Sequence, residues 1–145
     1  MPYIKVYIHF VWSTKRRQKF LNSFELRKKV WKHIKENSIK KDIHIEMING
    51  YSDHCHCLVS LDNEKSIGEV MRLLKGESSF WINKNRLCNE RFKWQNDYYA
   101  VSVCDSAIKN VRDYIKNQET HHKKFTFYDE FEEFIEKHGF ERFLD

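Results

Sequence analysis

The chain has 145 residues, of which 41% are apolar, 15% aromatic and 32% charged, with one proline and four glycines. This length is typical of one domain and allows a hydrophobic core without metal or disulfide staples. The low content of Pro and Gly excludes disordered and collagen-like chains. No apolar run approaches the roughly 20 residues that span a bilayer, and no signal-peptide pattern follows Met1, so we expect a cytoplasmic protein without a membrane anchor.

Charge is distributed unevenly along the chain. Lys and Arg number 26 against 21 Asp and Glu, which gives a net charge of +5. Residues 1–41, the basic front, hold 12 basic and 2 acidic side chains, whereas residues 125–145 hold 2 basic and 7 acidic ones. A basic front of this size is typical of a protein that binds nucleic acid, although a solvated helix face has the same composition.

In chain order, apolar patterning predicts strands over residues 3–12, 43–48, 53–61 and 98–103, and helices over residues 23–38, 66–83, 105–119 and 129–137. Ser23 is the expected N-cap of the first helix. Asn49-Gly50 predicts a hairpin turn, because both residues tolerate positive φ. The stretch 92–95 is expected to pair with the last strand across Asn96-Asp97.

The resulting order, β-α-β-β-α-β followed by helices, predicts an α+β fold of the ferredoxin-like, split βαβ type. In this arrangement helices pack on one central antiparallel sheet. We expect a single domain over residues 1–145, with an acidic helical tail over about 125–145. The fold supports many activities, so the functional argument has to come from a site.

The most informative segment is Asp53-His54-Cys55-His56-Cys57. Alternate side chains of a strand share a face, so His54 and His56 point the same way and can reach one ion, while Cys55 and Cys57 point to the other side. A four-ligand zinc site is therefore excluded, because its ligands must converge. All four cysteines are expected to be reduced thiols. Two histidines on a strand are also compatible with a plain polar surface.

A second segment supplies a possible third ligand and a nucleophile. Tyr114 and Gln118 are i and i+4 on the predicted helix 105–119, so they share a face about one turn apart. Packing of Tyr114 at the rim of the core, with Gln118 in solvent, is the simpler interpretation of this pair alone. Together with the histidines, an amide oxygen could hold a divalent cation that polarises a phosphate beside the tyrosine hydroxyl.

At these residues the chain resembles the HUH single-tyrosine transposases of the smallest bacterial insertion sequences, relatives of the transposases associated with repetitive extragenic palindromes (REP). The resemblance covers nearly the whole chain and includes these motifs: Trp12-Ser13-Thr14-Lys15, Asp53-His54-Cys55-His56, Leu74-Lys75-Gly76-Glu77-Ser78-Ser79, and Tyr114-x-x-x-Gln118 followed by His121-His122. One departure is Cys55, where the family has a large hydrophobe. Because Cys behaves as a small hydrophobe, this change should leave the metal site intact.

The resemblance implies a DNA transposase that acts on single-stranded DNA hairpins at element ends. It implies that His54, His56 and Gln118 hold Mg²⁺ or Mn²⁺, and that Tyr114 attacks the scissile phosphate to form a 5′-phosphotyrosine. A 3′-hydroxyl later resolves this intermediate and rejoins the strands. The family also implies a homodimer in which the tyrosine helix can serve the partner's histidines, with 104–106 as a possible hinge.

The DNA-binding surface is expected to include Trp12, Lys15, Arg16, Arg17, Lys75, Ser78 and Ser79. An aromatic ring beside positive charges suits single strands and hairpin tips, although solvated surface residues have the same pattern. Asp53 is expected either to orient His54 by a hydrogen bond or to belong to the adjacent turn. His121 and His122 either contact DNA or end a helix with favourable charge.

Two other functions stay open at this stage. One is a catalytically inactive hairpin-binding protein derived from a transposase. The other is an HUH nuclease of the replication-initiator or relaxase kind, which shares the two histidines but usually has further domains or a third histidine.

Overall fold

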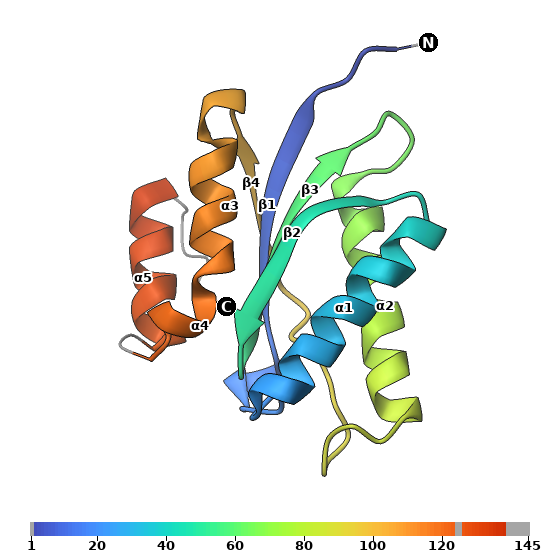
Figure 1. Ribbon diagram of the computed structural model, residues 1–145, viewed down its shortest axis with the longest axis vertical. Coiled ribbons are helices and arrows are strands. Elements are labelled where there is room, and N and C mark those ends of the chain that lie inside the picture. Colours follow the sequence, from blue (N-terminus) through green and yellow to red (C-terminus); the bar gives the residue numbers. More distant parts are fainter. Residues whose placement is uncertain (1, 124–125, 139–145) are drawn as a thin grey trace.

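A four-stranded antiparallel sheet forms the centre of the fold, which we describe from a computed structural model of residues 2–123 and 126–138 (Figure 1). The strands are β1 (Val6–Ser13), β2 (His44–Tyr51), β3 (His54–Leu61) and β4 (Tyr99–Val103). The α-helices are α1 (Phe24–Lys40), α2 (Ile67–Lys84), α3 (Ile108–Lys116), α4 (Gln118–His121) and α5 (Phe127–His138). Two short 3-10 helices are η1 (Lys15–Arg17) and η2 (Asp105–Ala107).

The strands are ordered β2-β3-β1-β4 across the sheet, and every neighbouring pair is antiparallel. The β1–α1–β2 unit is therefore split by β3, which confirms the predicted ferredoxin-like, split βαβ fold. In the register of the two central strands, Ser13 pairs with His54 and Val11 with His56. The two histidines consequently lie on one face of the middle of the sheet, next to β1.

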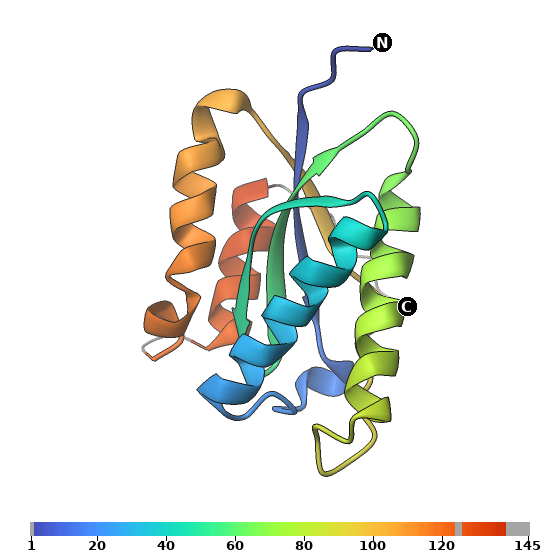
Figure 2. The same cartoon turned by 45° about the vertical axis from the view of Figure 1, so that its right-hand side comes forward.

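The helices divide between the two faces of the sheet, with α1 and α2 on one face and α3, α4 and α5 on the other (Figures 1 and 2). The first face carries the main hydrophobic core, whose largest strand-borne members are Phe10 and Trp12. Cys55 and Cys57 are fully buried in the same core as free thiols. Their burial confirms the predicted alternation along β3, and it leaves the histidine face to α3, α4 and α5.

Both long helices begin at the serines that the sequence suggests. The Ser23 side chain accepts a hydrogen bond from the Leu26 amide, and Ser66 accepts one from the Glu69 amide. A serine N-cap of this kind contributes about 1 kcal/mol to stability. The predicted ends of these helices are correct to within two residues, and the same is true of the acidic helix α5. Residues 139–145 of the predicted tail lie outside the described residues.

The predicted turn at Asn49-Gly50 is wrong, because both residues lie inside β2 and the hairpin turns at Ser52-Asp53. A glycine is needed at position 50 because the backbone of the neighbouring strand approaches closely, and not because the residue has a positive φ. A Cβ on Gly50 would lie 2.1 Å from the carbonyl oxygen of His54 across the hairpin. The turn therefore falls immediately before His54, so Asp53 is both a turn residue and a neighbour of the site.

Two further predictions need correction. Residues 92–95 do not pair with β4; Trp94 forms a bridge with Thr14 at the end of β1, and the Gln95 amide donates to the Ser13 carbonyl. The predicted helix 105–119 is interrupted, because α3 ends at Lys116 and a new turn, α4, starts at Gln118. The break lies between Tyr114 and Gln118, so these two residues do not share one continuous helix face. Among the described helices, none combines the length and apolar composition that crossing a bilayer requires.

Candidate active site

Three histidines meet on the face of the sheet opposite the main core. His54 and His56 come from β3 and are fully buried, and His9 from β1 is 6% exposed. The Nε2 atom of His9 lies 2.9 Å from Nδ1 of His56, so one of the two rings donates a hydrogen bond to the other. On the outer side of the site, Nδ1 of His54 donates to the carboxylate of Asp53 over 2.8 Å. Each of the paired histidines therefore has a partner that orients its ring.

The segment after the sheet brings in the predicted tyrosine and glutamine. Tyr114 lies near the end of α3, with its ring centroid 5.5 Å from that of His56. Gln118 opens α4 and is fully buried, with Oε1 3.0 Å from Nε2 of His54. The structure thus brings together all four residues of the predicted centre, His54, His56, Tyr114 and Gln118, within one chain.

A carboxylate that the sequence analysis missed stands among these groups. Glu130 of α5 is 4% exposed, and its Oε1 atom lies 2.7 Å from Nε2 of His56 and 3.4 Å from Nε2 of His54. The other oxygen, Oε2, accepts hydrogen bonds from the Tyr114 hydroxyl and from Nε2 of Gln118. No signal in the sequence marks this position, because residues 125–145 hold six other carboxylates besides Glu130.

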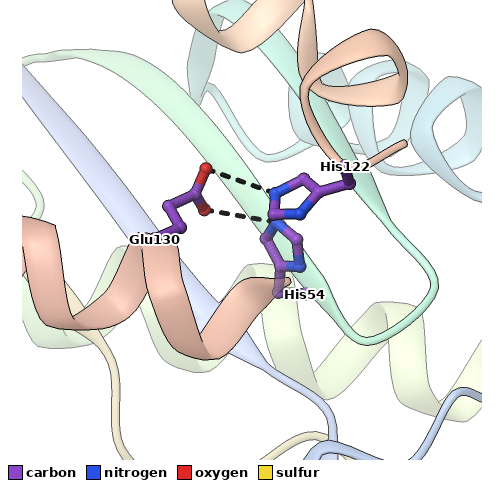
Figure 3. A group of neighbouring side chains, drawn as sticks. All are labelled: His54, His122 and Glu130. Carbon is purple, nitrogen blue, oxygen red and sulfur yellow. Dashed lines mark hydrogen bonds and ion pairs between the residues drawn. The ribbon is translucent and has the colours of Figure 1, made fainter. Parts of the chain in front are cut away.

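His122 reaches the same carboxylate from the end of α4. Its Nε2 atom lies 3.2 Å from Oε2 of Glu130, and Figure 3 shows both His122 and His54 pointing toward that side chain. One ligand atom from each of His54, His122 and Glu130 lies within 4.8 Å of the other two. His122 directly follows α4, so it lies at a helix end, as one of its two predicted roles requires, and it also lies inside the site. Nε2 of His121 also lies 3.1 Å from Oε2.

Burial and charge shift the protonation of this cluster. Burial alone would raise the pKa of Glu130, but electrostatic attraction to the adjacent His56 ring and hydrogen bonds from His122 and His56 hold it well below its ordinary value, so the carboxylate stays ionised. Burial and the nearby negative charge of Glu130 raise the pKa of Tyr114 far above 10, so the phenol stays protonated. Burial and the neighbouring His56 lower the pKa of His9 to about 3.

These donors fit a hard divalent cation. A carboxylate and an amide oxygen are ligands that Mg²⁺ and Mn²⁺ favour, and neutral imidazole suits Mn²⁺ in particular. Burial lowers the pKa of His56, despite the opposing charge of Glu130, so this ring tends toward the neutral form that binds metals. A cation held here could polarise a phosphate oxygen next to the Tyr114 hydroxyl.

The predicted DNA-binding residues lie around the far end of β1. Lys15 and Arg16 are exposed, and Arg16 and Arg17 both have left-handed backbone φ values near 55°. The Arg17 guanidinium lies over rings of α5, 4.8 Å from the centroid of Phe131. Such backbone strain costs on the order of 1–3 kcal/mol per residue and typically persists at functional sites.

Two of the remaining predicted contacts, Trp12 and Lys75, have partners within the protein. Trp12 is 1% exposed and packs edge-on against Trp94, so its ring is part of the hydrophobic core. The Lys75 ammonium donates to the carbonyl oxygens of Gln95 and Asn96, at 2.6 and 2.9 Å. Ser79 is half-buried on α2. For these residues, contact with DNA stays a prediction.

Two cavities flank α5. One of about 590 Å³ is lined by Tyr114 and Glu130 together with His9 and residues of β4 and α5. The other, of about 410 Å³, is lined by Arg16, Arg17, Tyr98 and Tyr99 and by Phe127 and Phe131 of α5. Because Tyr114 is 37% exposed, its ring can be approached from the first cavity.

The chain matches a family of transposases, and its fold is similar to those of two solved transposase structures. The family model described as "Transposase IS200 like" matches residues 3–118. The structure of a candidate transposase from Deinococcus radiodurans R1 is similar over 81% of this chain and 93% of that one, with 19% identity and a TM-score of 0.63. A REP-associated tyrosine transposase bound to a REP hairpin is similar over 84% of this chain and 72% of that one, with 17% identity and a TM-score of 0.61. No curated protein sequence matches the chain.

Proposed function

Because this chain belongs to the IS200-like transposase family, we propose that it cuts and rejoins single-stranded DNA at hairpin-containing element ends through Tyr114. The observation that carries this proposal is the position of the Tyr114 hydroxyl. It lies inside a buried group of imidazole, amide and carboxylate side chains, next to His56 and Gln118. A tyrosine that only packed at the rim of the core would need none of these partners.

Each residue of the centre has a role in this proposal. His54, His56 and Gln118 would hold Mg²⁺ or Mn²⁺. When bound there, the ion would supply charge neutralisation at the scissile phosphate. Asp53 fixes the orientation of His54, since its carboxylate accepts the hydrogen bond from Nδ1. Glu130 accepts a hydrogen bond from the Tyr114 hydroxyl, so its carboxylate is positioned to take the phenolic proton.

The chemical step balances without a nucleotide cofactor. The Tyr114 oxygen forms a bond to phosphorus as its proton leaves, and the bond from phosphorus to the 3′-oxygen breaks. The products are a 5′-phosphotyrosine and a 3′-hydroxyl that takes up a proton. Attack by a 3′-hydroxyl on the phosphotyrosine then rejoins a strand and restores the phenol. The phosphodiester energy is kept in the tyrosyl linkage throughout.

The surroundings of the centre support a nucleic-acid substrate. The cavity of about 590 Å³ beside Tyr114 offers space for a strand, and the exposed Lys15 and Arg16 add positive charge at the end of β1. A similar protein, the REP-associated tyrosine transposase, is bound to a REP hairpin. We extend hairpin binding to this chain on these grounds. A homodimer stays part of the proposal, although one chain already brings its own Tyr114 to its own histidines.

A covalent adduct tests this proposal. The substrates are single-stranded oligonucleotides from both strands of the DNA that flanks the coding region, labelled at the 3′ end and incubated with Mn²⁺. We expect a labelled protein band that withstands denaturation, because the protein stays on the 5′-phosphate of the labelled fragment. Tyr114→Phe should abolish the band, whereas Tyr128→Phe, at a position that is 58% exposed, should leave it unchanged.

The alternatives make different predictions in the same assay. A hairpin-binding protein without catalytic activity would bind the oligonucleotide tightly and give no adduct. An adduct that persists in Tyr114→Phe would assign the chemistry to another nucleophile. Loss of the adduct in Tyr128→Phe alone would place the nucleophile on α5 and contradict the proposal.

A further inference from the structure

The hydrogen-bonding groups around His54 do not match one another. Because a carboxylate can only accept, the 2.8 Å contact with Asp53 places the proton of a neutral His54 ring on Nδ1. Nε2 of that ring then carries a lone pair. It faces Oε1 of Gln118 at 3.0 Å and Oε1 of Glu130 at 3.4 Å, and both of these atoms are acceptors. With a neutral His54 ring, three acceptor atoms therefore face one another at one point inside the protein.

Rotating the Gln118 amide does not remove the mismatch. The amide nitrogen would then donate to Nε2 of His54. Its oxygen, however, would take the place that Nε2 now holds, 3.2 Å from Oε2 of Glu130. Either orientation leaves an acceptor against an acceptor in a place where every side chain is at least 95% buried. Convergent acceptors at such a depth are costly unless a positive charge lies among them, either a bound cation or a second proton on His54.

The position of Glu130 allows its carboxylate to be part of the coordination shell of a cation bound beside His54. Its Oε1 atom faces Nε2 of both His56 and His54, whereas its Oε2 atom is engaged by Tyr114, Gln118 and His122. The two oxygens thus have separate surroundings, one toward the imidazole pair and one toward the nucleophile. Two imidazoles and an amide carry no negative charge, so the carboxylate would supply the only anionic ligand of the set.

The position of α5 is fixed by contacts other than this carboxylate. The Phe127 ring stacks on His54 at 4.2 Å between centroids, and the Arg17 guanidinium lies over the rings of Phe127, Tyr128 and Phe131. Glu130 lies one turn after Phe127, so it is directed to the same point of the sheet. Packing therefore places the carboxylate, and its position does not depend on hydrogen bonds alone.

We infer that Glu130 is a ligand of the divalent cation, through Oε1 and together with His54, His56 and Gln118, so that α5 forms part of the metal centre. This inference rests on the proposed function for the presence of a cation, and it adds a ligand that lies beyond the residues 3–118 matched by the family model. It also gives α5 a role in the reaction, because the same carboxylate joins the cation to the Tyr114 hydroxyl.

Mn²⁺ binding without DNA tests the inference. The free Mn²⁺ signal in electron paramagnetic resonance is followed during titration of the full chain and of Glu130→Gln, which keeps the shape but removes the charge. We expect at least a tenfold loss of affinity in Glu130→Gln, since even outer-shell partners of a metal typically contribute about 10–100-fold. Glu136→Gln removes a charge from an exposed position of the same helix and should change the affinity less than twofold.

Equal affinity of Glu130→Gln and the wild type would overturn the inference. Tighter binding by Glu130→Gln would also overturn it, because the carboxylate would then occupy the place of the ion. A measurement on the wild type guards against a variant that folds poorly. Mn²⁺ should slow amide hydrogen exchange in α5 if Glu130 binds it, and faster exchange in α5 would contradict the inference.

Failure of the proposed function gives a different pattern. Suppose that Glu130→Gln loses Mn²⁺ affinity but the wild type forms no covalent DNA adduct. That result would support Glu130 as a metal ligand and contradict the proposed cleavage chemistry. The opposite result is an adduct that depends on Tyr114, together with Mn²⁺ affinity that Glu130→Gln does not change. It would support the proposed function and contradict the inference that Glu130 is a metal ligand.

Discussion

Arg27 of α1 holds Glu119 of α4 in a two-point ion pair, with its Nε and Nη2 atoms 2.6 and 2.9 Å from the two carboxylate oxygens. The third nitrogen, Nη1, donates to the carbonyl oxygen of Leu21 over 2.7 Å. Glu119 directly follows Gln118, so this pair fixes the segment that carries the predicted third ligand. The contact joins the two faces of the fold at the end of the sheet, within the same chain as the histidines.

Removing the Arg27–Glu119 ion pair should destabilise the protein and loosen the segment that carries Gln118. In Arg27→Met the Glu119 carboxylate stays partly buried without its partner, so we expect the free energy of unfolding to fall by about 2–3 kcal/mol. This is less than the roughly 3–5 kcal/mol typical of a broken, fully buried pair, because Glu119 is 22% exposed. Chemical denaturation measures the loss, and Lys28→Met on the exposed side of α1 is the control.

The double variant Arg27→Met/Glu119→Gln separates charge from packing. It should regain part of the lost stability, because no unpaired carboxylate remains. Mn²⁺ affinity should fall in Arg27→Met as Gln118 loses its support. Unchanged stability in Arg27→Met would show that the pair does not hold α4 in place.

Gly50 and Gly76 should respond in opposite ways to alanine. Gly50→Ala places a Cβ 2.1 Å from the His54 carbonyl oxygen, so the hairpin must shift, and we expect a loss of about 1–3 kcal/mol or more. In Gly76→Ala the new Cβ meets nothing within 4 Å on α2, and the better helix propensity of alanine should add about 0.5–1 kcal/mol. Thermal unfolding of both variants checks the signs. A neutral Gly50→Ala would show that the hairpin before His54 tolerates displacement.

Stability without added metal should fall as the pH drops below about 6.5. The unfolded chain protonates its histidines near that ordinary pKa, whereas burial lowers the pKa of His9 to about 3 and also lowers that of His56. Between pH 6.5 and 4.5 the unfolded state therefore binds more protons, and each such group lowers stability by up to about 1.4 kcal/mol per pH unit. Below 4.5 the lowered pKa of Glu130 acts in the same direction.

Denaturation at fixed pH values in the presence of a chelator measures this slope. The variant His9→Gln removes one of the titrating rings, so its slope between pH 6.5 and 4.5 should be shallower than that of the wild type. An identical slope in the two proteins would show that His9 takes up its proton in the folded state as easily as in the unfolded one.

Substitutions of the basic residues that follow β1 should have two kinds of effect, one on DNA binding alone and one on both DNA binding and stability. Lys15 and Arg16 are exposed, so Lys15→Ala or Arg16→Ala should weaken hairpin binding and reduce the slope of log K against log salt by about 0.7–0.9, without changing the thermal midpoint. Arg17 lies over the rings of α5, so Arg17→Ala should also lower the thermal midpoint. Fluorescence anisotropy with a labelled hairpin at several salt concentrations measures the slopes. A slope that is flat in the wild type would contradict this surface as the DNA contact.

Local patterns were sufficient for much of the fold. Alternation along residues 54–61 predicts that His54 and His56 share a face opposite Cys55 and Cys57, and the core contains both thiols. The Ser23 cap predicts where α1 begins, and the apolar pattern from residue 66 predicts where α2 begins. The turn at Asn49-Gly50 is wrong for a reason that no local rule contains. Gly50 is required by the backbone of His54, which approaches it across the hairpin.

The residues of the candidate site also fall into two groups, those that the sequence predicted and those that only the tertiary structure showed. The sequence by itself determined the histidine face of β3, because it follows from alternation along one strand, and it singled out Tyr114 and Gln118, although the helix break between them was not predicted. Only the tertiary structure decided that Glu130 and His9 join them, since these residues come from α5 and β1 and meet the histidines through long-range packing. Nothing in its local sequence distinguishes Glu130 from the other carboxylates of the acidic tail; the stacking of Phe127 on His54 and of Arg17 on the rings of α5 turns this one toward the centre.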